Sequence, residues 1–314
     1  MVSPIIIDSI VYGSLFALMS LGLTLSYLTS RVPNFAHGSF VTLGAYVAYA
    51  LSRFYGFNPY VATPISFVIG GIVGFAMYLL VLRPLMKRGS SVISLMIATF
   101  AVVIVFTGVF GIYADYLANV FKFADSRYFL LSRFDFNFYG LPGLFLVAPV
   151  FMILIFTALY IFFTKTTYGT AMRASVIDPD LSEVIGINTQ VVYSIAWFLA
   201  GGFAGLSGDL FILRLPGNPN IGLDFTVAFF AASLLGGLPS IYGALIGGII
   251  IGAGEILIAT YGTQLVGIWW ASYQPAIPMI IMVIGLILVP EGIVSIDRRS
   301  LRYRLGRLRF RSLK

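Results

Sequence analysis

The feature that most constrains this chain is a series of uncharged apolar runs, each long enough to cross a lipid bilayer. Crossing about 30 Å of hydrocarbon takes roughly 20 apolar residues at the helical rise. Residues 60–82 and 91–114 meet this length without a charged side chain, and residues 5–29 meet it with only Asp8, near the outer end. Just 10% of the chain is charged, against about 25% of a soluble protein. The sequence therefore predicts an all-α, polytopic integral membrane protein.

Six further apolar runs follow, and two of them, residues 35–51 and 225–235, are short for a full crossing. We expect seven to nine transmembrane helices, with a re-entrant segment wherever a short run does not cross. If every run crosses, the count is nine and the N-terminus lies outside. The six runs are 35–51, 143–164, 191–213, 225–235, 241–261 and 268–289.

Small residues and prolines predict how these helices pack and bend. Gly70 and Gly74 form a small-xxx-small pair, and Gly201 and Gly205 form another. Such pairs allow two helix backbones to approach closely. Two prolines in the last run, residues 275 and 278, predict a bend there.

The charged residues predict which side each loop faces. Arg83, Lys87 and Arg88 cluster in a short loop, which the positive-inside rule places in the cytosol. Residues 115–142 carry balanced charges and are expected to form an external loop. Eight of the nineteen lysines and arginines lie in residues 298–314, a tail expected to be cytosolic and to contact anionic lipid rather than nucleic acid. Residues 1–297 then form one transmembrane domain.

The longest charged segment that could form a helix on the cytosolic side is residues 168–188, YGTAMRASVIDPDLSEVIGIN. Asp178 reads as an N-cap, with Pro179 at the first helical position, and Gly186 as the stop. A helix this short is marginal alone in water, so its apolar face is expected to pack on something. A docking element for a soluble partner and an ordinary interfacial loop helix both fit. The apolar face consists of Leu181, Val184 and Ile185.

No motif for catalysis, nucleotide binding or metal binding is visible. The sequence contains neither a phosphate-binding G-x-x-x-x-G-K-[ST] loop nor H-E-x-x-H, and no convincing pairing of nucleophile and base. It has no cysteine and a single histidine, which leaves no thiolate or imidazole cluster for a metal. We therefore expect no catalytic residue, no metal and no cofactor held by this chain.

Two groups of polar residues in the apolar runs leave alternatives open. Asp8, Asp209 and Glu255 are expected near helix ends, reaching the headgroups or bonding backbone, whereas an ion-coupled transporter would need one of them buried. Asn34 and His37 fit a capped helix start with the histidine satisfied by a carbonyl. They fit equally a helix start whose amides point into a translocation path and suit a carboxylate.

Several of these segments together resemble the permease subunits of branched-chain amino-acid ABC importers, and among them the first of two paralogous permeases. The resemblance runs along most of the chain, and the order and spacing of its motifs are specific. The matching segments are GLTLSYLTSRVPNFAHG at 22–38, LGAYVA at 43–48, LRPL at 82–85, the 168–188 loop, and SLLGGLPSIYGALIGG at 233–248. Leu181 and Ser182 depart from the alanine-rich pattern usual in the loop, and Ser39 stands where an acid is common.

The resemblance implies a fold and a set of partners. The chain would be a multi-pass permease in the plasma membrane of a prokaryote, with its C-terminus in the cytosol. It would pair with a second permease, identical or paralogous, with two cytosolic ATPases that bind the ATP, and with an external substrate-binding protein. Branched-chain or related amino acids are the expected substrates. The alternative is an ion-coupled secondary transporter or channel for small polar solutes, amides and urea included.

The resemblance also implies residue roles. The 168–188 loop would contain the coupling helix that sits in a groove of the ATPase. The residues expected to couple are Arg173, Asp178, Leu181, Glu183, Val184, Ile185 and Gly186. The residues expected, on weaker grounds, along the substrate path are Asn34, His37, Gly236 and Gly237.

Overall fold

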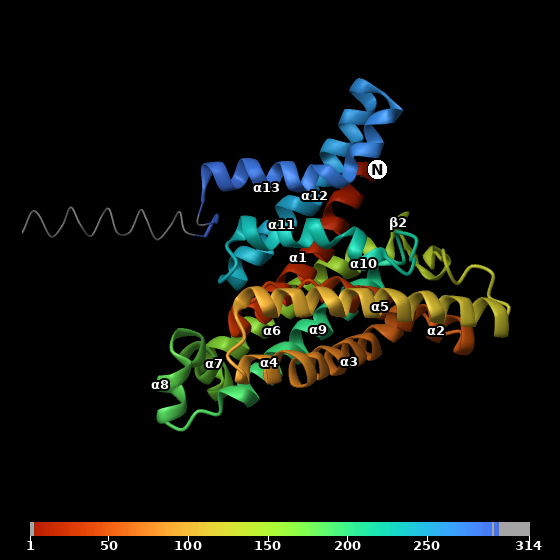
Figure 1. Ribbon diagram of the computed structural model, residues 1–314. Coiled ribbons are helices and arrows are strands. Elements are labelled where there is room, and N and C mark those ends of the chain that lie inside the picture. Colours follow the sequence, from red (N-terminus) through yellow and green to blue (C-terminus); the bar gives the residue numbers. More distant parts are fainter. Residues whose placement is uncertain (1–2, 291, 295–314) are drawn as a thin grey trace, which may run out of the picture.

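The computed structural model describes residues 3–290 and 292–294, and nearly all of its regular structure is helical (Figure 1). Within this part of the chain, the strands are confined to one two-stranded antiparallel hairpin, β1 (Asn137–Phe138) and β2 (Leu141–Pro142). The basic tail at 298–314 lies outside the described residues. The all-α architecture is confirmed.

Seven helical segments in the described residues are long and apolar enough to cross a membrane, within the predicted range of seven to nine. Their lengths run from 21 to 29 residues, which suits about 30 Å of hydrocarbon. The segments are α1 (Pro4–Ser30), α3 to α4 (Pro59–Met77, a π-turn Tyr78–Leu82, and Arg83–Lys87), α5 (Val92–Val120), α6 (Gly143–Lys165), α9 (Thr189–Phe211), α12 (Ile241–Val266) and η3 with α13 (Ile268–Ala276, Ile277–Leu288).

The remaining helices are shorter and lie between these segments. α2 (His37–Tyr55) and α11 (Thr226–Gly236) are the two short runs that the sequence marked. The connecting pieces are η2 (Ser132–Phe134), α7 (Thr167–Ile177), α8 (Pro179–Val184) and α10 (Ile221–Asp224).

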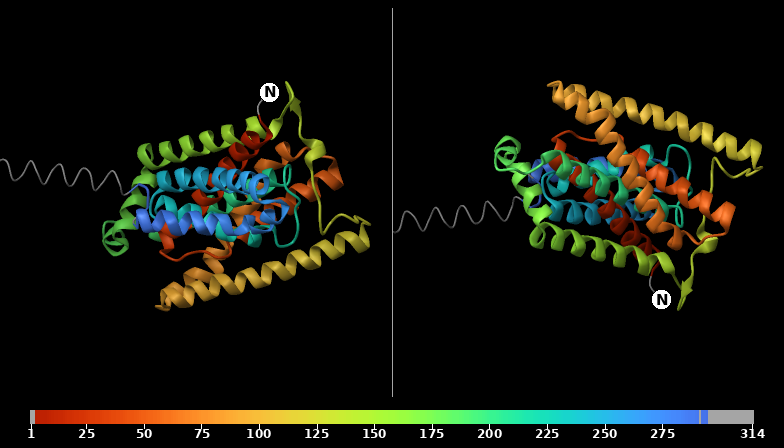
Figure 2. Two further views of the ribbon diagram at one scale, coloured as in Figure 1. Left: turned by 90° about the horizontal axis from the view of Figure 1, so that it is seen from above. Right: turned by 90° about the horizontal axis from the view of Figure 1, so that it is seen from below.

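α1 and α9 occupy the centre of the bundle, and most of their residues are buried. α5 and α6 run along opposite edges of the molecule, where much of their surface is exposed (Figure 2). α13 is also largely exposed. In a membrane protein such exposed apolar faces meet lipid or a neighbouring subunit.

Glycines bring the central helices into backbone contact. A Cβ atom added to Gly201 of α9 would lie 2.3 Å from the carbonyl oxygen of Gly70 in α3. One added to Gly205 would lie 2.5 Å from the carbonyl oxygen of Ser66. The predicted glycine pairs of α3 and α9 therefore face each other, and no larger residue fits between the two backbones.

Two helices begin inside the bundle rather than at its surface. α2 starts beside the middle of α1, where His37 Nε2 lies 2.9 Å from the carbonyl oxygen of Met19. α10 meets this same point, since Gly38 and Gly222 pack backbone against backbone. α11, with 11 residues, rises only about 16 Å. α11 is thus too short to cross, whereas α2 has 19 residues and differs from a simple span in where it begins. The irregular backbone beside both helices is enclosed by protein, as the bilayer requires.

The two prolines near the C-terminus mark a change of helix type. Pro275 lies in the 3₁₀ segment η3, and Pro278 lies in the first turn of α13. Neither proline can donate a backbone hydrogen bond, so the chain cannot run as one regular α-helix through this point. The structure thus shows a change from 3₁₀ to α geometry at the place where the sequence predicts a bend.

The loop that the sequence predicts to be external is shorter than expected, because α5 continues six residues beyond the expected end at Ala114. Asp115 lies within the helix and pairs with Arg127, whose guanidinium bonds both carboxylate oxygens at 2.7 Å. The loop after α5 is tied to α2 at Asp125, which accepts a 2.8 Å hydrogen bond from Tyr49 and an ion pair from Arg53.

We expect Gly201→Ala to lower the free energy of unfolding by about 1–3 kcal/mol, the usual cost of overpacking a tight interface. The matched control is Gly108→Ala in α5, where an added Cβ meets no atom within 4 Å and alanine favours the helix by roughly 1 kcal/mol. Thermal unfolding of the detergent-purified protein measures both. Equal effects of the two substitutions would contradict the close approach of α3 and α9.

The ion pair at Asp125 predicts a pH dependence. Burial raises the pKa of Asp125, but the hydrogen bonds from Arg53 and Tyr49 outweigh it and hold this pKa below its ordinary value. A depressed pKa stabilises the fold above the unfolded value of about 3.9, and the stabilisation is lost as pH falls through the folded value. We expect wild type to melt a few degrees above Asp125→Asn at pH 6 and the gap to close below about pH 4. The melting temperatures of the two proteins as a function of pH measure this, and a gap that stays constant down to about pH 3 would contradict it.

Candidate functional site

The α8 helix has the capped ends that the sequence predicts. Asp178 Oδ1 accepts a 3.0 Å hydrogen bond from the amide of Leu181, and Pro179 occupies the first helical position. At the other end Gly186 has a φ of +90°, which glycine adopts without strain. The amides of Gly186 and Ile187 donate back to the carbonyls of Glu183 and Ser182, closing the helix as a Schellman motif.

The apolar face of α8 is not covered by this chain. Leu181 is 59% exposed, Val184 82% and Ile185 66%. Ser182 is the buried residue of α8 instead, and its hydroxyl donates to the carbonyl of Asp178 at 2.7 Å. The sequence predicts that this face packs on something, but no described residue of this chain covers it. Three adjacent large apolar side chains therefore face outward.

α7 joins α8 to the central helices through its last carbonyl groups. The hydroxyl of Tyr193 in α9 donates to the carbonyl of Ser175 at 3.2 Å, and the guanidinium of Arg31 donates to that of Val176 at 3.0 Å. Cationic and hydroxyl donors at a helix C-terminus satisfy carbonyls that have no partner within the helix. Sequence reasoning missed both donors, and the only hint was that Arg31 directly follows the first long apolar run.

Arg173 and Glu183 contact other residues of this chain and are not part of the exposed apolar face of α8. Arg173 donates to the Thr170 hydroxyl at 3.2 Å and lines a cavity of about 300 Å³ between α6 and the α11–α12 turn. Glu183 accepts a hydrogen bond from the hydroxyl of Thr189 at the start of α9. Glu183 thus links α8 to α9, and the direct part of either residue in coupling stays a prediction.

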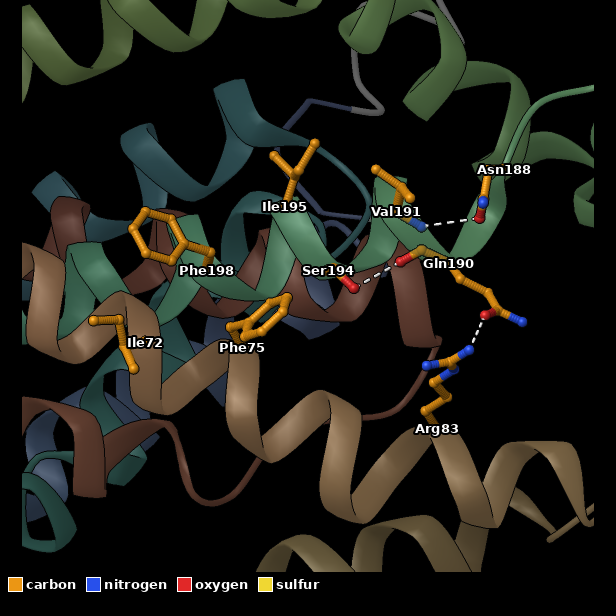
Figure 3. A pocket seen from close by; sticks show the side chains of 9 residues that line it. All are labelled: Ile72, Phe75, Arg83, Asn188, Gln190, Val191, Ser194, Ile195 and Phe198. Atoms are coloured by element: carbon orange, nitrogen blue, oxygen red, sulfur yellow. Dashed lines mark hydrogen bonds between the residues drawn. The ribbon is translucent and has the colours of Figure 1, made fainter.

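A second cavity, of about 690 Å³, lies at the same end of the molecule between α3 and α9 (Figure 3). Phe75 and Phe198 line its apolar part, while Arg83 and Gln190 bond to each other at its polar end. Asn188 caps α9 by accepting from the amide of Val191 at 3.2 Å. The cavity belongs to the lateral surface of the bundle, and its aliphatic and aromatic walls suit lipid.

Asn34 and His37 are both fully buried. Asn34 Oδ1 accepts from the amide of Ala36 at 3.1 Å, a local turn that precedes α2. His37 meets a backbone carbonyl through Nε2, while its Nδ1 atom and the Asn34 amide nitrogen have no hydrogen-bond partner among the described residues. The satisfied-histidine interpretation therefore holds at one ring nitrogen. A place for these residues on the substrate path stays a prediction.

Gly236 and Gly237 form the tight turn between α11 and α12. A Cβ on Gly236 would lie 1.9 Å from the carbonyl oxygen of Gly243, and Gly237 has a φ of +101°. Both residues are buried, so the structure gives them a packing role. Their contribution to a substrate path also stays a prediction.

The expectation that three acids sit near helix ends and reach outward is right for Asp8 alone. Asp8 pairs with Arg214 at the outer surface. Asp209 is near the end of α9 but fully buried beside the hydroxyls of Thr63 and Ser66, and neither of its oxygens makes a hydrogen bond of ordinary geometry to a described residue.

Glu255 departs from that expectation as well. It lies in the middle of α12, is buried, and accepts from the Gln274 amide at 3.0 Å. For Asp209 the expected place near a helix end was right, but the side of the helix that its neighbours cover could not be read from sequence. For Glu255 the place along the helix was wrong as well, because α12 continues to Val266. No group of three or more potential metal ligands occurs among the residues that the structure describes.

Comparison with known proteins gives a consistent result over the whole bundle. A family model described as the permease component of a branched-chain amino acid transport system matches residues 5–289. A probable branched-chain amino acid transport permease, LivH of Methanocaldococcus jannaschii, is 40% identical over 94% of this chain and 93% of its own. High-affinity permeases of such systems are 26% identical in Salmonella typhimurium (LivH; 92% and 94% covered) and 22% in Pseudomonas aeruginosa (BraD; 92% and 94%). No solved structure matches.

The caps of α8 generate a prediction about local stability. Removing the Asp178 side chain by Asp178→Ala should cost about 1 kcal/mol, enough to speed amide hydrogen exchange in residues 181–187 about fivefold. The melting temperature of the whole protein should stay unchanged, because α8 contributes little to the bundle. Asp180→Asn, which removes no capping bond, is the control. Unchanged exchange in the Asp178 variant would show that the cap does not hold the helix.

Proposed function

This chain belongs to the family of permease components of branched-chain amino acid transport systems, and we propose that it forms half of the translocation path of an ATP-driven importer. The substrates are branched-chain or related amino acids. Energy comes from a separate ATPase, because the sequence carries no phosphate-binding loop of its own.

The observation that carries the coupling proposal is the uncovered apolar face of α8. Leu181, Val184 and Ile185 are large, adjacent and exposed at the end of the molecule that also carries Arg83 and Lys87. The positive-inside rule assigns that end to the cytosol, where exposed apolar groups cannot be covered by hydrocarbon. A contiguous apolar patch facing water is typical of a protein interface. The occupant that fits is the groove of a cytosolic ATPase.

The anchoring of α7 supplies a mechanical route from this face to the bundle. α8 is attached to α9 through Glu183 and Thr189, and α7 is attached to α9 and to the end of α1 through the Tyr193 and Arg31 hydrogen bonds. α1 and α9 are the central helices. A displacement of α8 when two ATPases close on ATP would therefore tilt the central helices as a body and switch access from one side to the other.

The remaining parts of the proposal follow from the family. A second permease, identical or paralogous, completes the path, and an external binding protein delivers the substrate. The exposed faces of α5, α6 and α13 are surfaces available for the second permease. The proposal also assigns the C-terminus to the cytosol, as the positive-inside rule predicts for its basic residues.

An ion-coupled transporter remains the second candidate because one observation favours it. Asp209 is a fully buried carboxyl group with no charged partner among the described residues, which is the kind of group that such a transporter needs. Its position in the tight α3–α9 contact favours a packing role instead. If the importer proposal is right, Asp209→Asn leaves transport dependent on ATP and independent of ion gradients.

We expect the double substitution Leu181→Asp and Val184→Asp to abolish co-purification of the ATPase while the permease remains folded. Two carboxylates on the docking face would have to be buried against apolar groups, which costs several kcal/mol without a partner charge. The measurement is the ratio of ATPase to permease after affinity purification. The melting temperature of each variant reports on the fold.

The control is Tyr139→Asp, which places a charge on an aromatic side chain that is even more exposed, in the loop between α5 and α6. It should retain the ATPase in stoichiometric amount. Undiminished ATPase binding by the α8 double variant would remove the coupling proposal and make the ion-coupled transporter the leading candidate.

A further inference from the structure

A polar cavity of about 530 Å³ opens at the end of the bundle opposite α8. It lies between the middle of α5 and the loop that follows α9, so it faces outward if α8 faces the cytosol. Its volume falls in the range of small-molecule sites, about 300–1,000 Å³. The lining residues are Thr107, Gly111, Arg127, Tyr128, Asn218, Pro219, Asn220 and Asp224.

Charges of both signs line this cavity. Arg127 bonds Asp115 through Nε and Nη2, and no described residue accepts from its Nη1 group. Asp224 has no cationic partner in the described part of the chain, and its only side-chain contact there is a weak 3.4 Å hydrogen bond from the Asn218 amide. The cavity thus offers a free guanidinium donor and a carboxylate with free acceptor positions.

The wall that carries Arg127 is fixed in place on both sides. Ser126 is fully buried; its hydroxyl donates to the carbonyl of Ala114 at 2.8 Å, and its own carbonyl accepts from Tyr46 at 3.0 Å. Phe129 and Gly217 exchange two backbone hydrogen bonds, at 3.0 and 2.7 Å. This bridge joins the Arg127 loop directly to the Asn218 loop, so the two walls cannot separate independently.

The wall that carries Asp224 is fixed to α2, the helix that also carries Tyr46. The amide of Gly222 donates to the hydroxyl of Thr42 in α2 at 3.0 Å, and the amide of Asp224 donates to the carbonyl of Asn220 at 3.0 Å. Thr42 and Tyr46 are four residues apart, on one face of α2. One helical turn therefore anchors both charged walls of the cavity, which preorganises them for a ligand.

The third side of the cavity, formed by α5, has unfilled space. Thr107 and Gly111 line it, and a Cβ at Gly111 or at Gly108 would meet no atom within 4 Å. The exposed Tyr128 ring and Pro219 add apolar surface beside the charges. A ligand with two opposite charges and a compact apolar group matches these three sides.

We propose that this cavity is the outer recognition site for a zwitterionic amino acid, with Arg127 binding its carboxylate and Asp224 its ammonium group. The proposal rests on the proposed function and names the substrate contacts of this chain. The branched side chain lies along Gly111 of α5.

The test measures leucine binding to the purified full-length permease in lipid nanodiscs, without any binding protein. Two probes of similar shape each lack one charge: 4-methylpentanoate has no ammonium group, and 3-methylbutylamine has no carboxylate. Wild type should prefer leucine over both. In Asp224→Asn the preference for leucine over 4-methylpentanoate should fall about tenfold or more. In Arg127→Gln the preference for leucine over 3-methylbutylamine should fall by a similar factor. Each substitution removes one charge-assisted hydrogen bond to leucine.

Three control variants separate recognition from structure. Asp8→Asn and Arg133→Gln neutralise charges at the same end of the molecule but outside the cavity lining, and both should keep wild-type selectivity. Asp115→Asn breaks the ion pair that holds Arg127 without removing the guanidinium. The Asp115→Asn variant should still prefer leucine over 3-methylbutylamine. If it loses this preference, the effect of Arg127→Gln comes from the broken ion pair, and the proposed contact between Arg127 and the ligand carboxylate is wrong.

The remaining outcomes separate this proposal from the proposed function. In the complete system, with ATPase and binding protein, Asp224→Asn should raise the KM for leucine uptake at least tenfold and leave ATPase co-purification intact. If both cavity variants take up leucine with an unchanged KM, the proposed amino-acid site is wrong, whereas the proposed importer function stands. In a third outcome, the variants need more binding protein for half-maximal uptake, while their selectivity among the three probes is unchanged. That result would make the cavity a docking surface for the binding protein, and it would also overturn the proposed amino-acid site.

Discussion

The structure depends on direct backbone contact between helices at glycine residues. Between helices in lipid the hydrophobic effect gives no net attraction, so close packing has to hold the bundle together. Gly44 of α2 and Gly205 of α9 touch so closely that a Cβ on Gly44 would lie 1.8 Å from the Gly205 carbonyl oxygen. Gly208 meets α2 at Val41, and Gly248 of α12 meets α1 at Ala17. These contacts hold α2 against α9 and α12 against α1, as Gly201 and Gly70 hold α3 against α9.

This tight packing is what allows helices to stop inside the membrane. Where α2 and α10 meet, the turn backbone has no helical partners and would be costly in hydrocarbon. The surrounding helices supply them: Phe35 donates its amide to the Thr99 hydroxyl of α5, and Gly222 donates to Thr42. The buried hydroxyl pair of Thr24 and Ser233, 2.6 Å apart, lies in the same interior. Interrupted helices of this kind occur where a transporter needs polar backbone near its path.

α2 connects the two ends of the molecule that carry the functional proposals. Its first turn packs on α1 and α10, and its middle anchors both walls of the outer cavity. α1, which it contacts at Met19, ends at Arg31, the residue that holds α7 and through it the exposed face of α8. Direct contacts therefore connect the exposed face of α8 with the outer cavity through α7, α1 and α2.

The sequence by itself determined whatever depends on near neighbours in the chain. It predicted the apolar spans within a few residues, the Asp178 cap and Gly186 stop of α8, and an irregularity at Pro275 and Pro278. It marked residues 35–51 and 225–235 as short and left open whether they cross. Length, capping chemistry and proline geometry are local properties. The sequence ended the span before Asp115, on the rule that a charged residue marks the end of an apolar run. This was wrong, because α5 continues through Asp115, whose charge is paired with Arg127 twelve residues later.

Only the tertiary structure decided which sides of the helices are covered. α12 carries glycines on several sides, and nothing local shows that Glu255 would face Gln274. The same holds for the two donors that anchor α7 and for the outer cavity, whose lining comes from residues 107 to 224. Helix rotation, and the meeting of loops distant in sequence, are set by backbone contacts at glycines on other helices. The residues of a functional site therefore follow from packing that no single segment encodes.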